Sequence, residues 1–311
     1  MSKRKSGLNI HGILLLDKRL GVSSNRALQE VRHLFNANKA GHTGSLDPLA
    51  TGLLPLCFGE ATKVSGLMLD DNKRYQVVVQ LGIMTDTGDL EGTVLETKPV
   101  PLLSKDLILA CLEKFTGEID QVPPMYSALK LNGKKLYELA RAGITVERKA
   151  RHIKIFELKL LSDSQALANS PDLLMLDVFC SKGTYIRSLA EDIGHYLGCG
   201  ATVKELRRLE AGQFNIKDAK TIEQLTAMDQ QSLAACLINV DKPLEGLPAV
   251  QLSEAQTVSI KQGQSVMFPD FSLVPKLELA NKVCMYHDAV FLGLGEMSLD
   301  GKLAPKKLFN L

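Results

Sequence analysis

Three glycines and two prolines fall within the fifteen residues from Gly41 to Pro55, and this density of turn-forming residues predicts a sharply turned loop. Turns of this kind bring backbone N–H groups and short polar side chains close to a ligand. One carboxylate, Asp47, lies in the middle of the loop, and Leu46 and Pro48 flank it with apolar surface. We therefore expect Asp47 to project from an apolar surface that excludes water, a setting that suits a reactive carboxylate.

The pair Asp47-Pro48 is also typical of the start of a helix. An aspartate at the N-cap followed by a proline at the first helical position is a common arrangement. On these two residues alone capping is the more common role, so the choice between capping and chemistry depends on the longer motif around them.

The basic residues are unevenly distributed, although the net charge of the 311-residue chain is only +2. Residues 1–40 contain eight Lys and Arg against two acids, and residues 126–159 contain nine against three. Two local basic surfaces on a nearly neutral protein are expected if a polyanion is bound at particular places. They are equally compatible with two ordinary solvated faces.

Cysteine spacing and hydropathy exclude several classes of protein. The six cysteines form no C-x-x-C pair, which argues against a zinc site and for reduced thiols in the cytoplasm. Neither a dinucleotide-binding nor a nucleoside-triphosphate motif occurs. The basic N-terminus has no apolar core of signal-peptide length, and no run approaches eighteen apolar residues, so nothing directs the chain to a membrane.

Hydrophobic periodicity predicts strands joined both directly and through helices. The expected strands cover residues 12–18, 74–82, 93–100, 153–161, 173–180 and 203–209. Two expected helices follow caps, one at Ser23 or Ser24 and one at Ser104. The others cover residues 61–69, 134–142 and about 221–237, and a further helix carries on from the stretch 181–187 to Leu197. This order favours an α+β fold around a mixed, mainly antiparallel sheet flanked by helices. Residues 85–92 are acidic, but their spacing favours a polar hairpin turn over a calcium loop.

Two regions stand apart from this pattern. Residues 121–151 form a basic insertion with a proline-rich lead, and the helix that follows the lead could close over a ligand. Near residues 243–246 the pattern changes to short strands and turns, which predicts a small all-β domain. We therefore divide the chain into residues 1–245 and 246–311, in keeping with two domains for a chain of this length.

The string GHTGSLDPLATGLLP at residues 41–55 closely resembles the catalytic-loop motif of the TruB family of tRNA pseudouridine synthases. Residues 126–128 and 133–137 resemble the family segment that covers the RNA, and residues 180–187 resemble a further family motif. The C-terminal segment more loosely resembles a PUA RNA-binding domain. The resemblance covers essentially the whole chain, and it favours chemistry over capping for Asp47.

The resemblance implies a pseudouridine synthase fold and an activity. A uridine in the T-arm of tRNA, conventionally position 55, would be converted to pseudouridine by breaking the N1–C1′ bond and rejoining the base through C5. Because this is an isomerisation, it requires no cofactor, metal or redox partner. The target base would have to flip out of the folded RNA to reach any side chain.

Three residues match the catalytic positions of the family. Asp47 would act as nucleophile or would deprotonate the sugar, and the sequence leaves these two alternatives open. Arg187 would serve as its counter-ion, and we expect the arginine to lower the pKa of Asp47 more than burial raises it. Tyr75 would stack on the extracted base and could relay a proton from C5.

Further positions match family residues that bind substrate. His42, Tyr185 and Leu206 would contact the target nucleotide or line its pocket. Candidates for contacts with the RNA backbone are Lys18, Lys130, Lys134, Lys135 and Lys182. The expected partner is tRNA, held by its T-arm stem-loop and, through the C-terminal domain, by its acceptor end. No obligate protein partner is evident.

One departure from the family and two competing functions remain. Arg19 replaces the proline that usually follows the Asp-Lys pair, which leaves the stiffness of that turn open. The chain could instead be a non-catalytic RNA-binding protein or tRNA folding chaperone. It could also be a metal-dependent RNA hydrolase that uses Asp47 with Asp86 or Asp89, which would require clustered ligands.

Overall fold

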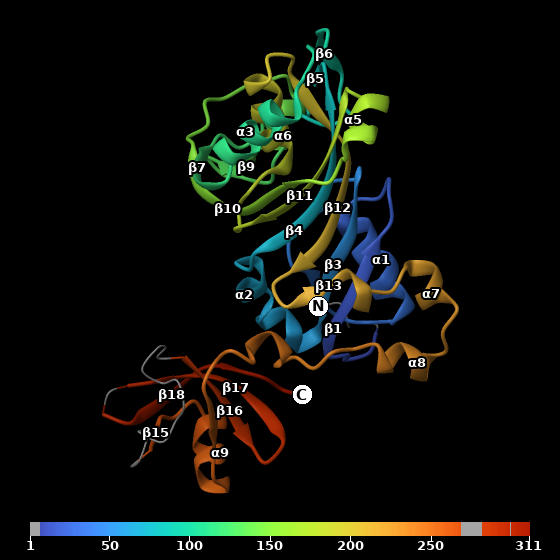
Figure 1. The fold of residues 1–311 in the computed structure, drawn as a ribbon. Helices are drawn as coiled ribbons and strands as arrows, with labels where there is room; N and C mark the ends of the chain where they lie inside the picture. The colour runs from blue at the N-terminus through green and yellow to red at the C-terminus, as the bar shows by residue number, and fades with distance from the viewer. Residues whose placement is uncertain (1–6, 269–281, 299) are drawn as a thin grey trace.

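The computed structural model describes residues 7–268, 282–298 and 300–311. Figure 1 shows a long twisted sheet with helices at both of its ends and a second, smaller sheet near the C-terminus. In the described part of the chain, no helix has the length and apolarity needed to cross a bilayer.

The main sheet has nine strands in the order β1-β3-β12-β4-β11-β10-β7, with β2 added to β3 and β13 added to β12. β3 and β12 pair in parallel, and the other described neighbours pair antiparallel, so the predicted mixed, mainly antiparallel sheet is confirmed. The strands are β1 (Gly12–Lys18), β2 (Ala40–His42), β3 (Ala50–Phe58), β4 (Lys73–Leu81), β7 (Gly117–Gln121), β10 (Arg151–Leu160), β11 (Leu173–Cys180), β12 (Ala201–Ala211) and β13 (Phe214–Asn215).

Two helices, α1 and α3, begin where the sequence places their caps. The Ser23 side chain caps α1 and the Ser104 side chain caps α3, each by accepting from a backbone N–H in the first turn. The predicted helices at 61–69 and 221–237 are each split into shorter pieces. The helical elements are α1 (Ser24–Leu34), η1 (Gly59–Lys63), α2 (Ser65–Leu69), α3 (Lys105–Lys114), α4 (Leu136–Arg141), α5 (Ser164–Asn169), α6 (Ile186–Tyr196), η2 (Ile216–Asp218), α7 (Ile222–Thr226), α8 (Gln230–Ala235), η3 (Lys242–Leu244) and α9 (Glu254–Lys261).

The glycine- and proline-rich stretch is a loop only in its middle part, because Gly41 and His42 already belong to β2. Residues 43–49 connect β2 to β3, whereas residues 50–55 already belong to β3. The prediction of a loop as far as Pro55 was therefore wrong. The reason is burial, because Leu53, Leu54 and Leu56 are fully inaccessible and form part of a strand between β1 and β12.

Two short hairpins extend from the main sheet. β5 (Ile83–Thr85) pairs with β6 (Val94–Thr97), which confirms the hairpin turn at 85–92. The partner of β6 is thus the short strand β5 and not the long strand β4. In the basic insertion, β8 (Lys130–Leu131) pairs with β9 (Lys134–Lys135) ahead of α4.

The C-terminal sheet has five strands in the order β14-β16-β17-β18-β15 and carries helix α9. Its strands are β14 (Ala249–Gln251), β15 (Val266–Met267), β16 (Lys282–His287), β17 (Val290–Met297) and β18 (Lys302–Leu308). The expected C-terminal β domain is thereby confirmed.

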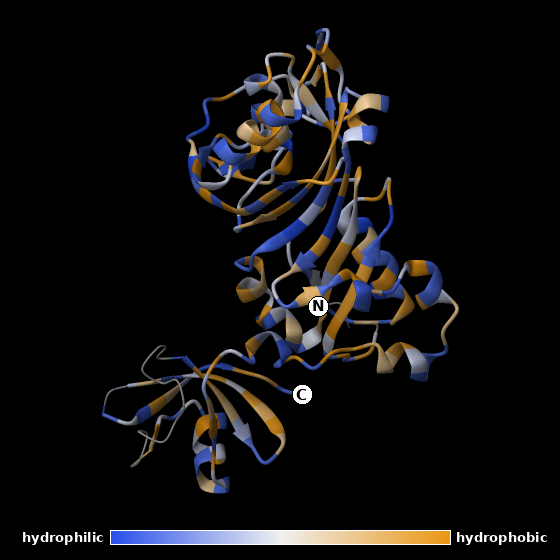
Figure 2. Cartoon of the chain, viewed as in Figure 1, coloured by the Kyte–Doolittle hydropathy of each residue, from blue (hydrophilic) through white to orange (hydrophobic). Residues whose placement is uncertain are grey.

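The two sheets share one apolar cluster. Phe291 and Phe309 from the C-terminal region pack in the same buried cluster as Ile13 and Leu53 of the main sheet. Polar contacts reinforce this packing, since the Lys63 ammonium donates to Leu308 O at 2.6 Å. Figure 2 shows hydrophobic residues along β1, β3 and β17, three of the strands that contribute to this cluster. The C-terminal sheet is therefore packed against the main sheet and is not a loosely tethered unit.

Candidate active site

Asp47 lies in the loop between β2 and β3, and the loop is pinned beside it. The Ser24 hydroxyl at the start of α1 accepts from Leu46 N at 2.7 Å and donates to Leu46 O at 2.9 Å. The residues after Pro48 enter strand β3, so Asp47 caps no helix. The capping alternative is therefore excluded, and the aspartate is held in place by the buried residue that precedes it.

Asp47 meets Arg187, which is 140 positions away in the chain. The Arg187 Nε lies 3.1 Å from Asp47 Oδ2, and the arginine side chain is 6% exposed whereas the aspartate side chain is 44% exposed. The Arg187 guanidinium also donates to Thr87 O at 2.8 Å and to Tyr126 O at 2.7 Å. The cation is thus fixed by the protein, while the carboxylate remains accessible to a ligand.

Asp89 is a second carboxylate at this cation, and the sequence suggested it only as a possible metal ligand in the competing hydrolase. Its Oδ2 lies 3.7 Å from Arg187 Nη1, and its side chain is 5% exposed. The Thr87 hydroxyl donates to Asp89 Oδ1 at 2.6 Å and Glu91 N donates to the same oxygen at 3.2 Å. The acidic hairpin turn was the available signal, because a buried acid in such a turn needs a cationic partner.

Burial dominates the electrostatics of Asp47. Desolvation raises the pKa of Asp47 above its ordinary value, and the nearby Asp89 carboxylate adds to the rise. Arg187 and Lys18 oppose the rise without overcoming it. Our expectation that the arginine would outweigh burial was therefore wrong, because desolvation of Asp47 is the largest cause and exceeds the effect of Arg187, and the Asp89 carboxylate adds to the rise.

Tyr75 and Leu206 lie on neighbouring strands and face the same side of the sheet. Tyr75 of β4 is opposite Arg208 of β12, and Leu206 is opposite Val77 two residues along. Tyr75 is half-buried, and burial raises the pKa of its phenol. The charge of Asp47 adds to this rise. Leu206 is buried and contributes to the main core.

Tyr185 and His42 complete the predicted pocket residues. Tyr185 precedes α6, where the Gln121 amide donates to its O at 3.1 Å and accepts from its N at 2.8 Å. The charge of Asp47 reaches the Tyr185 phenol, whose pKa burial raises. His42 is half-buried in β2, and burial followed by the charge of Arg208 lowers its pKa, which favours the neutral imidazole.

Lys18 was predicted to contact the RNA backbone, and the structure contradicts this prediction. Its side chain is 1% exposed, and its ammonium donates to Val22 O at 2.7 Å and to Arg19 O at 3.0 Å. Burial lowers the pKa of Lys18 to about 8, a fall that Asp47 partly opposes. Its hydrogen bonds therefore go to the chain itself, and no face of the ammonium is left for a phosphate.

The other lysine candidates lie at the surface. Lys130 and Lys134 are exposed on the hairpin of the insertion. Lys135 is half-buried, and its ammonium lies 5.3 Å from the centre of the Tyr137 ring. Lys182 is exposed, and its Nζ lies 3.0 Å from Asp70 Oδ1. Three residues of the first basic segment, Lys3, Arg4 and Lys5, lie outside the described residues.

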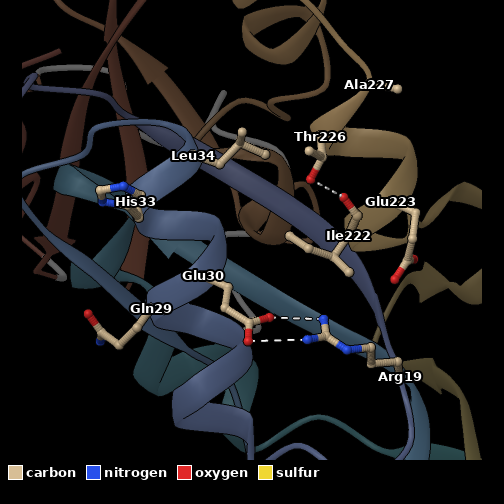
Figure 3. Close-up of a pocket in the computed structure, with 9 residues that line it drawn as sticks. All are labelled: Arg19, Gln29, Glu30, His33, Leu34, Ile222, Glu223, Thr226 and Ala227. Carbon is tan, nitrogen blue, oxygen red and sulfur yellow. Dashed lines mark hydrogen bonds and ion pairs between the residues drawn. The ribbon is translucent and has the colours of Figure 1, made fainter.

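A separate pocket lies between α1 and α7 and shares none of these site residues (Figure 3). Its lining includes Arg19, whose Nη1 lies 2.9 Å from Glu30 Oε2. This ion pair ties the turn after β1 to α1 at the position where the family usually has a proline.

Comparison with known proteins identifies what the chain resembles. The family model described as TruB family pseudouridylate synthase (N terminal domain) matches residues 32–186. The model for the tRNA pseudouridylate synthase B C-terminal domain matches residues 187–245, and the model described as Pseudouridine synthase II TruB, C-terminal, matches residues 248–309.

Relatives match along the whole chain. The tRNA pseudouridine synthase B of Chromohalobacter salexigens is 49% identical over 310 residues, which cover 100% of this chain and 98% of the relative. The protein of the same name from Pseudomonas fluorescens is 50% identical over 306 residues, covering 97% and 96%.

Solved structures share the fold at lower identity. An H/ACA RNP bound to a substrate RNA containing 2'-deoxyuridine matches with a TM-score of 0.71 and 21% identity, covering 100% of this chain and 92% of that one. A Cbf5-Nop10-Gar1 complex matches with a TM-score of 0.71 and 22% identity, covering 100% and 91%. These two likenesses support the fold, and the site rests on the geometry above.

Proposed function

Because the chain belongs to the TruB family of pseudouridylate synthases, we propose that it modifies position 55 in the T-arm of tRNA with Asp47 as the catalytic carboxylate. The chain is an isomerase that converts uridine in tRNA to pseudouridine. The observation that carries the proposed role of Asp47 is its pair with Arg187, in which a buried cation holds an accessible carboxylate.

The geometry suits a carboxylate that acts on a flipped nucleotide. The rigid Arg187 fork orients Asp47, so little reorganisation is needed when charge moves on the carboxylate. Asp47 would attack the target nucleotide covalently or remove a proton from its ribose, and both alternatives require the ionised form. Tyr75 would stack on the base and Tyr185 would close the pocket, which offsets the few kcal/mol needed to unstack the uridine.

The RNA backbone would be bound outside this pocket. Lys130, Lys134 and Lys135 of the insertion and Lys182 beyond β11 are the basic side chains that we assign to the T-arm. We assign the acceptor end of the tRNA to residues 246–311 as a PUA-like unit, and residues 1–245 to catalysis. Since its substrate is tRNA, we place the enzyme in the cytoplasm.

The metal-dependent hydrolase fits the site less well. Asp47 and Asp89 both lie against the Arg187 guanidinium, so the place between the two carboxylates already holds a cation. A divalent ion there would have to displace an arginine held by two backbone carbonyls. A role as folding chaperone alone would not require the ion pair between Asp47 and Arg187.

Incubation with an unmodified tRNA transcript, followed by nucleoside analysis and mapping of the modified position, tests the proposed function. We expect about one pseudouridine per tRNA at position 55, formed without any cofactor. The transcript is folded in monovalent salt and the reaction repeated with EDTA. A modification elsewhere would refute the target, and loss of turnover that a divalent ion restores would favour the hydrolase.

Truncation after Glu245 should weaken tRNA binding and reduce the salt dependence of the affinity, because it removes phosphate contacts without touching the pocket. Activity on an isolated T-arm stem-loop should survive. The structure adds a cost in stability, because the truncation uncovers Ile13 and Leu53 of the shared cluster. Salt titrations of tRNA binding and thermal unfolding measure the two effects.

Phe309→Ala in the full-length chain is the matched control for this truncation. Phe309 is 6% exposed in the shared cluster, so its loss should lower the free energy of unfolding by about 3–5 kcal/mol. The salt dependence of tRNA binding should stay that of the wild type. A folded truncated protein that is inactive on the stem-loop would overturn the division of roles between the two units.

A further inference from the structure

Arg208 is a fully buried cation for which the site so far has no role. Its side chain on β12 is 1% exposed and is among the largest fully buried side chains of the described residues. Within the described residues no carboxylate forms an ion pair with it, in contrast to its neighbour Arg207, which lies 2.7 Å from Asp17. A buried charge of this kind is expensive unless its donors are well satisfied.

The Arg208 guanidinium donates hydrogen bonds to backbone carbonyls on both sides of Asp47. Its Nε donates to Leu53 O in β3 at 2.7 Å, and its Nη2 donates to Gly44 O in the preceding loop at 3.2 Å. Gly44 is three residues before Asp47, so one side chain fixes the loop relative to the strand that follows it. A planar guanidinium can make both bonds at once, whereas a lysine ammonium has no such fixed fork.

A glycine in the loop motif brings β3 close to Arg208. Gly52 is the parallel partner of Arg208, and its φ is +100°. A Cβ at Gly52 would lie 2.3 Å from Arg208 O, which is far inside contact distance. The glycine therefore has a local reason, because the two strands could not approach with a side chain there.

Arg208 also faces Tyr75. The two residues are directly opposite on β12 and β4, so their side chains leave the same face of the sheet. The charge of Arg208 opposes the rise in the pKa of Tyr75 that burial causes. Since arginine can only donate, a hydrogen bond between the two side chains would have the Tyr75 oxygen as acceptor and would leave the phenol proton to point into the pocket.

We propose that Arg208 is a positioning residue that fixes the Gly44 carbonyl and the Tyr75 hydroxyl relative to each other, so that Asp47 and Tyr75 face the same nucleotide. The inference rests on the proposed function through the roles given there to these two residues. Arg208 touches no reacting atom and acts through the groups it holds.

Arg208→Lys keeps the charge and removes the fork, so it is the principal test. We expect the single-turnover rate constant at saturating enzyme to fall roughly 100-fold, as for a misplacement of about 1 Å, while the Kd for tRNA is unchanged. Arg208→Met should lose at least as much. Rates are expressed per folded molecule, measured by near-UV circular dichroism at the assay temperature, so a destabilised variant still reports on the proposal.

Arg207→Met is the matched control, since it removes the adjacent arginine from the opposite face of β12. We expect its rate constant to match the wild type. A double-mutant cycle with Tyr75→Phe supplies the readout that a purely structural role would not change. If Arg208 orients the hydroxyl, Arg208→Lys should cost less in the Tyr75→Phe background than in the wild type.

Two results would overturn the inference. One is a wild-type rate per folded molecule in Arg208→Lys, and the other is a loss of the same size with and without the Tyr75 hydroxyl. The proposed function has its own test, because an active Asp47→Asn variant would refute the catalytic site whatever Arg208 does. Normal turnover in Arg208→Lys beside an inactive Asp47→Asn would refute the positioning role alone.

Discussion

Asp47→Asn should reduce pseudouridine formation by about 10⁴-fold or more while the affinity for tRNA stays close to that of the wild type. The amide keeps the shape of the carboxylate and much of its hydrogen bonding, but it can neither attack the nucleotide nor accept a proton from the ribose. Single-turnover assays and tRNA binding measurements separate the loss of chemistry from a loss of binding.

The stability of the Asp47→Asn variant is a second, independent observable. Because the pKa of Asp47 is raised on folding, the ionised carboxylate disfavours the folded state above that pKa. The variant should therefore unfold at the same temperature as the wild type or slightly higher at neutral pH. The difference should vanish in acid, below the ordinary aspartate pKa of about 4, where the carboxyl is protonated in both states.

Asp71→Asn is a suitable control for both measurements. Burial also raises the pKa of Asp71, but no contact links Asp71 to Arg187 in the described structure. We expect normal turnover from this variant. Substantial pseudouridine formation by Asp47→Asn would show that another group performs the chemistry.

The sequence predicts the elements of this fold better than their extents. Local signals such as the Ser23 and Ser104 caps mark helix starts correctly, because a cap acts within one turn. The end of the loop was missed because Gly52 and Pro55 are typical of turns in isolation, whereas their burial depends on β1 and β12. Strand pairing is non-local, and residue types alone do not reveal it.

In the candidate site, too, contacts between distant residues could not be predicted from local sequence signals. The contact between Asp47 and Arg187 was predicted through resemblance alone, since nothing local connects residues so far apart. The contact of Asp89 with Arg187 and the role of Arg208 were not predicted, because both depend on partners that only folding brings together. Lys18 was assigned to phosphate because a lysine in a basic segment is ordinarily exposed, and only the structure shows its ammonium under the loop.

The Arg187 guanidinium joins three separate segments of the chain. It contacts Asp47 in the loop, Thr87 and Asp89 in the hairpin turn, and Tyr126 in the lead of the basic insertion. The insertion that we assign to RNA binding is thus bonded directly to the counter-ion of the proposed catalytic carboxylate. A change at Arg187 should consequently affect stability, acid–base behaviour and catalysis together.

Arg187→Met should lower the free energy of unfolding at neutral pH by about 3–5 kcal/mol and abolish most of the activity. Methionine keeps an unbranched apolar stem, but it strands the buried Asp89 and leaves two carbonyls without their donors. Asp47 should add less to this cost because its side chain is 44% exposed. Chemical denaturation at neutral pH measures the change.

The pH dependence of the residual activity gives the sign of the coupling. Arg187 lowers the pKa of Asp47 against burial and against Asp89, so its removal leaves two causes that both raise that pKa. The fraction of ionised Asp47 then falls at each pH, and the acid limb of the pH–rate profile should move to higher pH. An unchanged acid limb would mean that a different group controls ionisation at the site.

Second substitutions decide which stranded charge causes the loss of stability. Adding Asp89→Asn to Arg187→Met should restore more stability than adding Asp47→Asn, because the Asp89 side chain is 5% exposed and water can solvate the more accessible Asp47. Neither double variant should regain activity, since the counter-ion is absent in both. Strictly additive losses in both double variants would show that the carboxylates are not coupled to Arg187, and the charge network proposed for the site would then be wrong.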